Sequence, residues 1–338
     1  MTRIVVAGSG GWGTALACML ANSGRQVVLM SHFEEEARSI SYHRENREFL
    51  PGALLPDNLT VIHMSEKCLA QYLPEADAAV IAAPSKHVRA TMERIQAYIA
   101  AKTIFVSVSK GLDSSPPLRL SEVIALYAPK NRIAALSGPS HAEEVARNLP
   151  TACVAASEDY AAAKAVQDIF MNRFFRVYAS VDLLGVELGG ALKNVIALAA
   201  GISDGLGYGD NAKAALMTRG MAEITRLGVA MGGMAGTFAG LSGMGDLIVT
   251  CTSMHSRNRR AGILLGQGKS LDETLKAVHM VVEGVNTAHS AYELSKVYGV
   301  EMPITYEINQ ALFCGKDPAQ AVVDLMTRDK TSEGIEHI

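Results

Sequence analysis

The sequence has little charge, few aromatic residues and no close pair of cysteines. Charged residues make up 19% of its 338 residues, aromatic residues make up 6%, and the formal net charge is −3. This composition excludes a disordered charged chain and disfavours a nucleic-acid-binding surface, which requires clustered basic residues. The five cysteines are widely scattered, without a CxxC pair or a metal-ligand spacing. We therefore predict reduced, buried thiols and no metal site.

Long hydrophobic runs are also missing. No apolar run approaches the roughly 18 residues that a membrane span requires. A strand-like run begins within three residues of the N-terminus, which leaves no room for a signal peptide. We therefore expect a soluble, cytoplasmic protein with no membrane span and no nucleic-acid partner.

The first half of the sequence alternates short apolar runs with helical patterns. Runs rich in β-branched residues and alanine predict strands at residues 3–7, 26–30, 78–84, 103–109, 133–138, 151–157 and 175–180. Such runs suit strands buried on both faces of a mostly parallel sheet. Because the segments between them have helical spacing, we expect a doubly wound α/β domain.

The pattern changes near residue 181. From Asp182 onward, long helical patterns are separated by glycine-rich segments at 201–211, 230–246 and 262–270, with almost no strand candidates. We therefore expect two domains, an α/β domain over residues 1–181 and an all-α domain over residues 182–338. The alternative is one continuous α/β domain, since such domains can be long.

A glycine cluster, GSGGWG, occupies residues 8–13. A strand-like run leads into Gly8, Gly10 and Gly13, and an amphipathic helical pattern follows. In a dinucleotide-binding βαβ unit these glycines make the tight turn, let the backbone approach the pyrophosphate, and let the helix pack closely on the strand. The helix N-terminus then supplies amide donors to the phosphate. The cluster predicts a Rossmann-type domain, and the alternative is an ordinary strand-to-helix turn.

The residues after the second predicted strand concern the choice of cofactor. An NAD-selective unit usually has an acidic residue about 20 residues beyond the glycines, where it binds the ribose 2′-hydroxyl. This chain has Ser31 and His32 there, and three glutamates begin two residues later. A histidine tolerates or binds a 2′-phosphate, and Arg38 adds charge one helical turn on. We expect a site that admits NADPH, with an exposed loop histidine as the alternative for His32.

Two loops at the ends of the next predicted strands face the same region. Pro84 and Ser85 end one strand, at a place where backbone commonly flanks a nicotinamide ribose. Lys110 follows the next strand. Because ligands of open α/β sheets bind beyond the carboxyl ends of the strands, Lys110 is a candidate binding residue. The alternative is a solvated surface lysine.

Lys193 and Asn194 interrupt a strongly apolar helical pattern. Their neighbours are leucine, valine, isoleucine and alanine, and Glu187 lies six residues back, which makes it a poor partner on the same face. An unpaired buried lysine is costly, and burial lowers its pKa toward neutrality, where it can donate or accept a proton. We therefore interpret Lys193 as a catalytic candidate, with a snorkelling lysine as the alternative.

Polar residues also mark the segment from 246 to 260. Asp246 and Thr250 are four residues apart and share a face if the segment is helical. Ser256, Arg257 and Asn258 follow, and an arginine between small hydrogen-bonding side chains suits a phosphate. The alternative for this arginine-rich run is a solvated helix face.

These segments resemble those of bacterial-type NAD(P)-dependent glycerol-3-phosphate dehydrogenases. The matching segments, in the family's order from residue 8 to about residue 310, are GSGGWGTA, SKGL, SGPSHAEE, GGALKNVIALAAGISDG, SGMGDLIVTCTSMHSRNRR and VVEG. The resemblance implies hydride transfer between NAD(P)H and dihydroxyacetone phosphate, which supplies glycerol 3-phosphate for glycerophospholipid synthesis. It implies that Lys193 accepts the proton during alcohol oxidation and that Lys110 contacts both cofactor and substrate.

The resemblance also implies further contacts. Positions that match contacts with the nicotinamide cofactor are Gly11, Trp12, His32, Ala142, Val281 and Glu283. Positions that match glycerol-phosphate contacts are Gly138, Ser140, Asp246, Ser256, Arg257 and Asn258, and Arg257 is shared with the cofactor. Asn194, Asp246 and Thr250 would hold the geometry around the two lysines.

Two other functions are weighed against this one. Another β-hydroxyacid-type dehydrogenase with a catalytic lysine would explain the fold and Lys193, but not the Ser-Arg-Asn grip on a phosphate. A non-enzymatic NADPH sensor would keep the glycine loop but would not need Lys193, Asp246 and Arg257 together. Helical second domains of this kind often pair, so we expect a homodimer.

Overall fold

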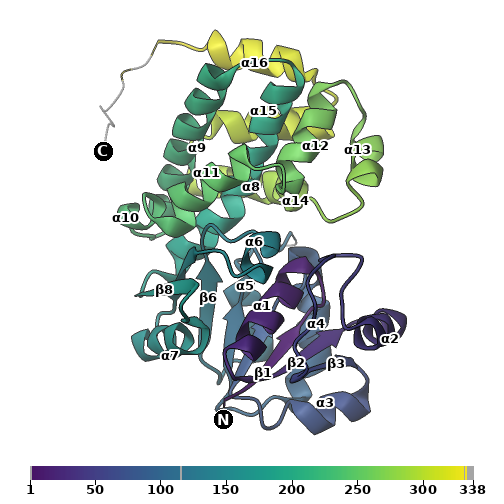
Figure 1. The fold of residues 1–338 in the computed structure, drawn as a ribbon. Coiled ribbons are helices and arrows are strands. Elements are labelled where there is room, and N and C mark those ends of the chain that lie inside the picture. The colour runs from purple at the N-terminus through teal and green to yellow at the C-terminus, as the bar shows by residue number, and fades with distance from the viewer. Residues whose placement is uncertain (1, 115, 331, 333–338) are drawn as a thin grey trace.

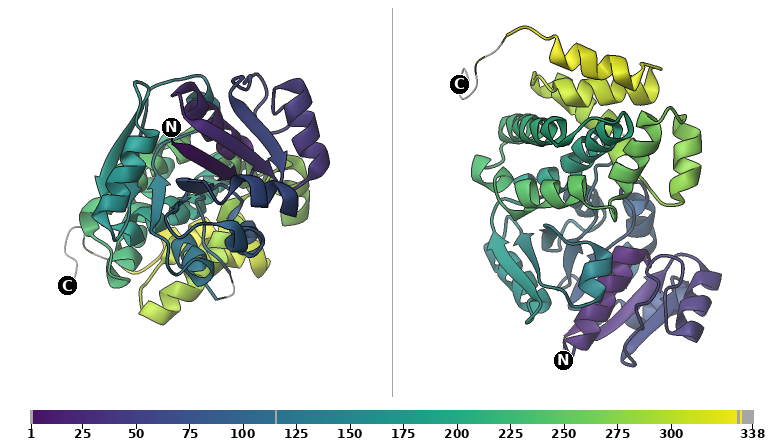
Figure 2. Two further views of the ribbon diagram at one scale, coloured as in Figure 1. Left: turned by 90° about the horizontal axis from the view of Figure 1, so that it is seen from below. Right: turned by 45° about the horizontal axis from the view of Figure 1, so that its top comes forward.

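The computed structural model describes residues 2–114, 116–330 and 332. An α/β domain forms the lower part of Figure 1 and a helical domain forms the upper part. The right-hand view in Figure 2 shows the same division, with the strands at one end and the green and yellow helices at the other. The expected fold class, a Rossmann-type α/β domain followed by an all-α domain, is confirmed.

Eight strands form one sheet in the first domain. They are β1 (Arg3–Ala7), β2 (Gln26–Ser31), β3 (Leu59–His63), β4 (Ala78–Ile81), β5 (Ile104–Ser107), β6 (Ile133–Ser137), β7 (Thr151–Ala156) and β8 (Phe175–Ser180). Their order is β3-β2-β1-β4-β5-β6-β7-β8, and every neighbouring pair is parallel except β6 and β7. Because β1 lies between β2 and β4, the chain changes direction across the sheet at β1, where such folds bind their ligands.

The strand predictions were right for seven strands and missed one. The predicted strands 78–84 and 103–109 are shorter in the structure, because their last residues form the loops that carry Ser85 and Lys110. The missed strand, β3, lies at the sheet edge and contains the polar residues Thr60 and His63. An edge strand is covered less completely than a central one, so it lacks the continuous apolar run used for the other predictions.

Alternating side chains of the central strands supply two cores, one on each face of the sheet. Ile4 and Val6 of β1 pack in one core with helix α1, whereas Val5 and Ala7 pack in the other core with helices α4 and α5. This period of two explains why the strands read as continuous apolar runs, since both faces are covered. The sheet is therefore held rigidly, with its carboxyl edge free to carry functional loops.

The helices of the first domain lie between the strands in sequence. They are α1 (Gly11–Asn22), α2 (Glu34–His43), α3 (Glu66–Tyr72), the 3₁₀ turn η1 (Ser85–His87), α4 (Val88–Ile95), the 3₁₀ turn η2 (Gln96–Tyr98), α5 (Leu120–Tyr127), α6 (Ala142–Ala146) and α7 (Tyr160–Phe170). Helix α2 begins at the three glutamates, as the charge pattern predicts for a helix N-terminus.

The second domain is helical. It contains α8 (Leu183–Gly205), α9 (Asp210–Ala230), α10 (Ala235–Phe238), the π-helical turn η3 (Leu241–Gly245), α11 (Asp246–Thr252), α12 (Arg257–Gly266), α13 (Leu271–Val278), α14 (Glu283–Tyr298), α15 (Pro303–Phe313) and α16 (Pro318–Met326). Two of the expected glycine-rich breaks, 201–211 and 262–270, are wrong in their first halves, because α8 continues to Gly205 and α12 continues to Gly266.

Helix α8 is the central element of this domain, and α9, α11, α12 and α14 pack against it. Its contact with α12 is very close: a Cβ atom on Gly262 would lie 2.2 Å from the Leu198 carbonyl oxygen, and one on Gly201 would lie 2.1 Å from that of Arg259. The glycines that look like helix breakers in the sequence are therefore contact residues between two helices.

By length and composition, α8 is also apolar enough to cross a membrane. No apolar run of this length was expected from the sequence. Helix α8 is the only such helix among the described residues, and 89% of its apolar window is buried inside the protein. Burial of this extent identifies α8 as a core helix of the folded domain.

Candidate active site

The glycine cluster forms the turn between β1 and α1. Gly8 has φ of +121°, and a Cβ atom there would lie 2.8 Å from the backbone of Ala82 in the neighbouring loop. A Cβ atom on Gly13 would lie 2.0 Å from the Gly8 carbonyl oxygen, whereas one on Gly10 would meet no heavy atom within 4 Å. The first and third glycines thus permit tight packing, and the second leaves an open approach to the backbone.

The N-terminus of α1 suits an anionic group. Its N-cap, Gly10, offers no side-chain acceptor, and the first turn contains no acidic residue. The amide groups of this turn are therefore available to a phosphate. Nearby, Trp12 donates a hydrogen bond from Nε1 to the Val108 carbonyl oxygen at 3.1 Å, and a Cβ atom on Gly11 would lie 3.9 Å from the Ala142 side chain. The turn fits a dinucleotide pyrophosphate.

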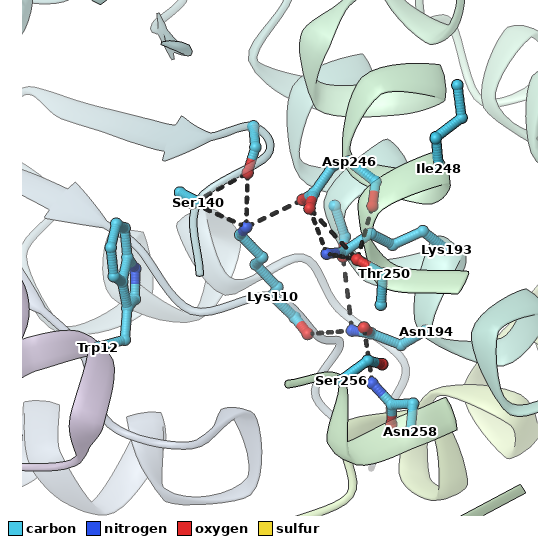
Figure 3. A network of polar contacts seen from close by, with 12 residues as sticks. Trp12, Lys110, Ser140, Lys193, Asn194, Asp246, Ile248, Thr250, Ser256 and Asn258 are labelled. Carbon is cyan, nitrogen blue, oxygen red and sulfur yellow. Dashed lines mark hydrogen bonds and ion pairs between the residues drawn. The ribbon is translucent and has the colours of Figure 1, made fainter. Parts of the chain in front are cut away.

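Lys110 lies just beyond the carboxyl end of β5, where its ammonium group meets three acceptors. Nζ lies 2.8 Å from the Gly138 carbonyl oxygen, 3.1 Å from Ser140 Oγ and 2.9 Å from Asp246 Oδ2. The side chain is 18% exposed, so one face of the ammonium group remains accessible. Lys110 therefore links the sheet edge to the helical domain (Figure 3).

Lys193 is buried on α8, with only 4% of the residue exposed. Its Nζ contacts Asp246 Oδ1 at 2.5 Å and Thr250 Oγ1 at 2.7 Å. Burial lowers the pKa of Lys193 to about 8, and the charge of Asp246 opposes this shift. The lysine is thus protonated at neutral pH but close to its titration midpoint, as a proton-transfer group requires.

Asp246 forms an ion pair with each of the two lysines. It is the first residue of α11, and Thr250, one turn later, donates to its backbone carbonyl oxygen at 2.6 Å. Burial alone would raise the pKa of Asp246, but Lys110 and Lys193 outweigh burial and hold that pKa below its usual range. The carboxylate therefore stays ionised and fixes the two ammonium groups side by side.

Two glycines on α8 allow this close packing. A Cβ atom on Gly189 would lie 2.8 Å from the Ser242 carbonyl oxygen in η3, and one on Gly190 would lie 2.5 Å from Ser137 Oγ on β6. These positions precede Lys193 by one turn. The sheet edge and the turn that leads to Asp246 can therefore both approach α8 next to the lysine.

A chain of amide hydrogen bonds crosses the site. Asn194 donates to the Lys110 carbonyl oxygen at 2.8 Å, and Asn258 donates to Asn194 Oδ1 at 2.8 Å. Asn258 Oδ1 in turn accepts from the backbone nitrogen of Gly284 at 2.8 Å. The amide group of Asn258 is thus committed to holding α8, α12 and α14 together.

Arg257 and Glu283 flank this chain of amides. Within the described part of the chain, Arg257 has no hydrogen-bonded or ion-paired partner. Burial lowers the pKa of Arg257, and the charges of Glu283 and Glu143 oppose this. Glu283 accepts hydrogen bonds from the backbone nitrogen and the hydroxyl of Ser85, so it joins the β4 loop to the start of α14. An arginine without a partner in a partly buried place is suited to an anion.

The network in Figure 3 brings together residues that are far apart in the sequence. Connected by hydrogen bonds and ion pairs are Lys110, Gly138, Ser140, Lys193, Asn194, Asp246, Thr250 and Asn258. Ser256 lies at the edge, where its hydroxyl caps α12 by accepting from the Arg259 backbone nitrogen at 3.2 Å. His32 lies outside this network, on the loop after β2.

Two residues near these groups were not singled out from the sequence. His141 is the N-cap of α6, and its buried Nε2 atom has no hydrogen-bond partner among the residues that the structure describes. Burial, followed by the charges of Lys193 and Lys110, lowers the pKa of His141. Arg94 on α4 contacts His32. The SGPSHAEE segment could have pointed to His141, but nothing in the sequence connects residue 94 with residue 32.

The chain matches the family models for the N-terminus and C-terminus of NAD-dependent glycerol-3-phosphate dehydrogenase, over residues 3–163 and 182–323. It is 54% identical over 333 residues to glycerol-3-phosphate dehydrogenase (NAD(P)+) of Desulfitobacterium hafniense strain Y51, covering 98% of this chain and 93% of that protein. The enzyme of the same name from Pelotomaculum thermopropionicum is 53% identical, with 98% and 95% covered. The crystal structure of glycerol-3-phosphate dehydrogenase from Coxiella burnetii superposes with a TM-score of 0.92 at 38% identity, covering 97% of this chain and 99% of that one.

Proposed function

The chain belongs to the NAD-dependent glycerol-3-phosphate dehydrogenase family, and we propose that it interconverts dihydroxyacetone phosphate and sn-glycerol 3-phosphate with NADP(H) or NAD(H). The observation that carries this proposal is a pair of lysines on one buried carboxylate, Lys110 and Lys193 on Asp246, beside a dinucleotide-type turn. The product glycerol 3-phosphate would supply glycerophospholipid synthesis.

Lys193 is the acid–base group of the reaction. When bound, the reduced nicotinamide supplies a hydride to the carbonyl carbon of the ketone. Negative charge then develops on the carbonyl oxygen, and the Lys193 ammonium group stabilises this charge and donates its proton there. In the reverse direction, neutral Lys193 accepts the proton of the alcohol. A pKa near 8 suits both directions.

Four residues hold Lys193 in position. Asp246 and Thr250 accept from and orient its ammonium group, Asn194 ties α8 to the backbone of residue 110, and Lys110 places a second positive charge beside the reacting oxygen. Because all four are fixed by packing and hydrogen bonds before any ligand binds, little reorganisation accompanies the chemical step.

The substrate is held by residues from both domains. Arg257 binds the phosphate, for which its planar guanidinium group is suited, with Ser256 and Asn258 at its sides. At the sheet edge, the substrate-binding residues are Lys110, Gly138 and Ser140. This arrangement requires a phosphate on one side of the carbonyl carbon and so favours dihydroxyacetone phosphate over a simple hydroxyacid.

The residues that would hold the cofactor lie along the carboxyl edge of the sheet. The turn that contains Gly8, Gly10 and Gly13, with Gly11 and Trp12 beside it, would hold the pyrophosphate. The remaining cofactor-binding positions are His32, Lys110, Ala142, Arg257, Val281 and Glu283. Glu283 accepts hydrogen bonds from Ser85, which follows the end of strand β4. This contact supports a position for Glu283 near the nicotinamide ribose.

The organisation of the protein follows from these roles. Residues 1–181 form the dinucleotide-binding domain, and residues 182–338 form the substrate-binding and catalytic domain. We place the enzyme in the cytoplasm as a homodimer without a metal requirement, nucleic-acid partner or membrane span. The scattered free cysteines support a reducing compartment.

The reaction is tested by following absorbance at 340 nm with dihydroxyacetone phosphate and NADPH or NADH. We expect oxidation of the cofactor, and a loss of at least about 100-fold in turnover in Lys193→Ala, because the acid–base group is removed. A matched control is Lys296→Ala, which removes a lysine of an exposed ion pair on α14. Unphosphorylated dihydroxyacetone should be a poor substrate. Cofactor binding without turnover of dihydroxyacetone phosphate would overturn the proposal.

A further inference from the structure

A group of basic side chains gathers at the carboxyl ends of β2, β3 and β4. His32 follows β2, His63 ends β3 and pairs in register with Ser31, His87 ends η1, and Arg94 lies on α4. Arg94, His87 and His63 are close enough to affect the charge of His32. Burial, and then these three groups, lower the pKa of His32, and Glu36 opposes them. The lowered pKa of His32 favours its neutral form, so the positive charge of this region comes from Arg94.

Arg94 is the strongest cation of this group and is not neutralised. Its Nη1 atom lies 3.3 Å from His32 Nδ1, and it has no acidic partner among residues 2–114, 116–330 and 332. Arg89, five residues earlier on the same helix, differs in this respect. Its Nε and Nη2 atoms contact Asp113 Oδ2 at 2.8 Å and 2.5 Å.

The nearby carboxylates are already engaged. Glu36 accepts from Ser9 Oγ at 2.8 Å and from Ser31 Oγ at 2.5 Å, so both of its oxygens face the backbone turn. Glu34 pairs with Arg38 at 2.6 Å. Arg38 is 77% exposed and is paired with this carboxylate, whereas Arg94 has no such pair in the described part of the chain.

This place is where the adenosine ribose of a dinucleotide lies in the Rossmann fold. The ribose 2′ position faces the residues just after the second strand, where an acidic residue selects NAD and a nearby arginine accommodates a 2′-phosphate. The chain has no acidic residue at positions 31–33, and its nearby uncommitted arginine comes from α4.

We propose that Arg94 and His32 together bind the 2′-phosphate of NADPH, and that Arg94 is the residue that sets the preference for NADPH over NADH. This inference rests on the proposed function only in requiring that the cofactor is a nicotinamide dinucleotide. The guanidinium group donates to the phosphate, and its contact with His32 orients the imidazole toward the same anion.

The test measures cofactor binding directly. Trp12 is the only tryptophan in the chain, and it lies at the cofactor turn, so its fluorescence reports binding of either nicotinamide without turnover. NADPH and NADH are titrated into the unmodified protein, Arg94→Gln and Arg38→Gln, and displacement by 2′,5′-ADP is measured in each. Arg38→Gln is the matched control, because it removes an arginine of α2 that is paired with Glu34.

We expect Arg94→Gln to weaken NADPH binding by about tenfold or more, since a charge-assisted contact with a phosphate is lost. NADH binding should change by less than about twofold, because NADH has only a hydroxyl group there. Displacement by 2′,5′-ADP should weaken in parallel with NADPH binding, and Arg38→Gln should leave all three constants near those of the unmodified protein.

Two results would overturn the inference. One is equal weakening of NADPH and NADH in Arg94→Gln, and the other is selective weakening of NADPH in Arg38→Gln rather than in Arg94→Gln. Both leave the proposed dehydrogenase reaction intact. If the unmodified protein bound neither nicotinamide cofactor, the proposed function itself would fail, so the two failures are distinguishable.

Discussion

At the scale of single residues, the site depends on one carboxylate that serves two lysines. Asp246 compensates the charge of Lys110 and Lys193, so two ammonium groups can lie close together at the place where an alkoxide would form. With three charges in the cluster, one net positive charge remains. That positive charge is what a developing oxyanion requires, and burial strengthens its effect.

This arrangement predicts how the reaction depends on pH. With Lys193 as the proposed acid, ketone reduction requires its protonated form. Burial lowers the pKa of Lys193 to about 8, so kcat/KM for reduction should be constant below that pH and fall as pH rises through it. Alcohol oxidation needs neutral Lys193, so kcat/KM for oxidation should rise over the same interval. Initial rates at 340 nm in both directions test this. Profiles that move in the same direction, or stay flat from about pH 6 to pH 10, would contradict the assignment.

The sequence predicted several of these residues and could not predict their partners. Lys193 stood out because a lysine in an apolar helix is unusual, and Asp246 and Thr250 stood out by their spacing. That Asp246 contacts both lysines depends on how η3 and the sheet edge pack on Gly189 and Gly190. The contact between Arg94 and His32 depends on the strand order, which brings residues 62 positions apart together. The roles of these residues stay predictions.

At the scale of elements, glycine has two different uses in this chain. In the turn after β1 it permits unusual backbone geometry, whereas on α8 and α12 it permits close packing of two helices. The two uses look alike in the sequence. For this reason the segment 262–270 was expected to be a break, although its first residues continue a helix.

The close contact of α8 and α12 predicts a large effect of one methyl group. Gly262→Ala would bring a Cβ atom to 2.2 Å from the Leu198 carbonyl oxygen, and because both sides of this contact are backbone, the helices must separate. We expect a loss of about 2 kcal/mol or more in unfolding free energy, measured by urea denaturation.

The control for this substitution is Gly236→Ala. It lies on α10, where a Cβ atom would meet no heavy atom within 4 Å. The replacement should be neutral or stabilise the protein by about 0.5 kcal/mol, because alanine favours helix. Similar losses for both variants would show that the α8–α12 contact is not specially tight.

At the scale of the whole molecule, a buried carboxylate joins the two domains. Glu187 on α8 accepts from the Ser121 backbone nitrogen at 2.8 Å, from Ser121 Oγ at 2.5 Å and from Arg119 Nη1 at 3.2 Å, all at the start of α5. Burial raises the pKa of Glu187, and Arg119 opposes this. From the sequence, Glu187 was judged a poor partner for Lys193. In the structure, Glu187 is bound by Arg119 and Ser121, which belong to the first domain.

Removing this carboxylate should destabilise the molecule strongly. Glu187→Ala leaves the backbone amide and hydroxyl of the buried Ser121 without their acceptor and removes one of the two carboxylates that contact Arg119, so we expect a loss of about 3 kcal/mol or more in unfolding free energy. Thermal and urea unfolding measure this loss. Glu122→Ala is the matched control, because Glu122 contacts the same arginine from an exposed position.

The control variant should lose only about 1 kcal/mol, the usual worth of an exposed ion pair with a helix cap. Equal losses in the two variants would mean that Glu187 contributes no more than a surface carboxylate, and the domain junction would then depend on apolar packing alone.

Helix α8 belongs to both domains. Its first turns pack Leu183 and Val186 against Ala135 of β6 and Ala156 of β7, and the rest forms the core of the helical domain. The antiparallel pair β6–β7 makes this possible. Because β7 and β8 run opposite to β6, β8 ends beside the amino ends of the other strands, and α8 begins there. The helix therefore rises alongside the sheet and passes the carboxyl edge at Gly190 (Figure 1).

One consequence concerns the angular phase of this helix. Successive residues of a helix are rotated by about 100°. The direction in which Lys193 points therefore depends on the number of residues between it and the start of α8, which packs on the sheet through Leu183 and Val186. A single inserted or deleted residue between the anchor and the lysine would turn Lys193 away from Asp246 and Asn194 away from the Lys110 carbonyl oxygen, while the site residues of the other elements stay in place. The number of residues from 186 to 193 is therefore fixed, because it sets the direction in which the Lys193 side chain leaves the helix.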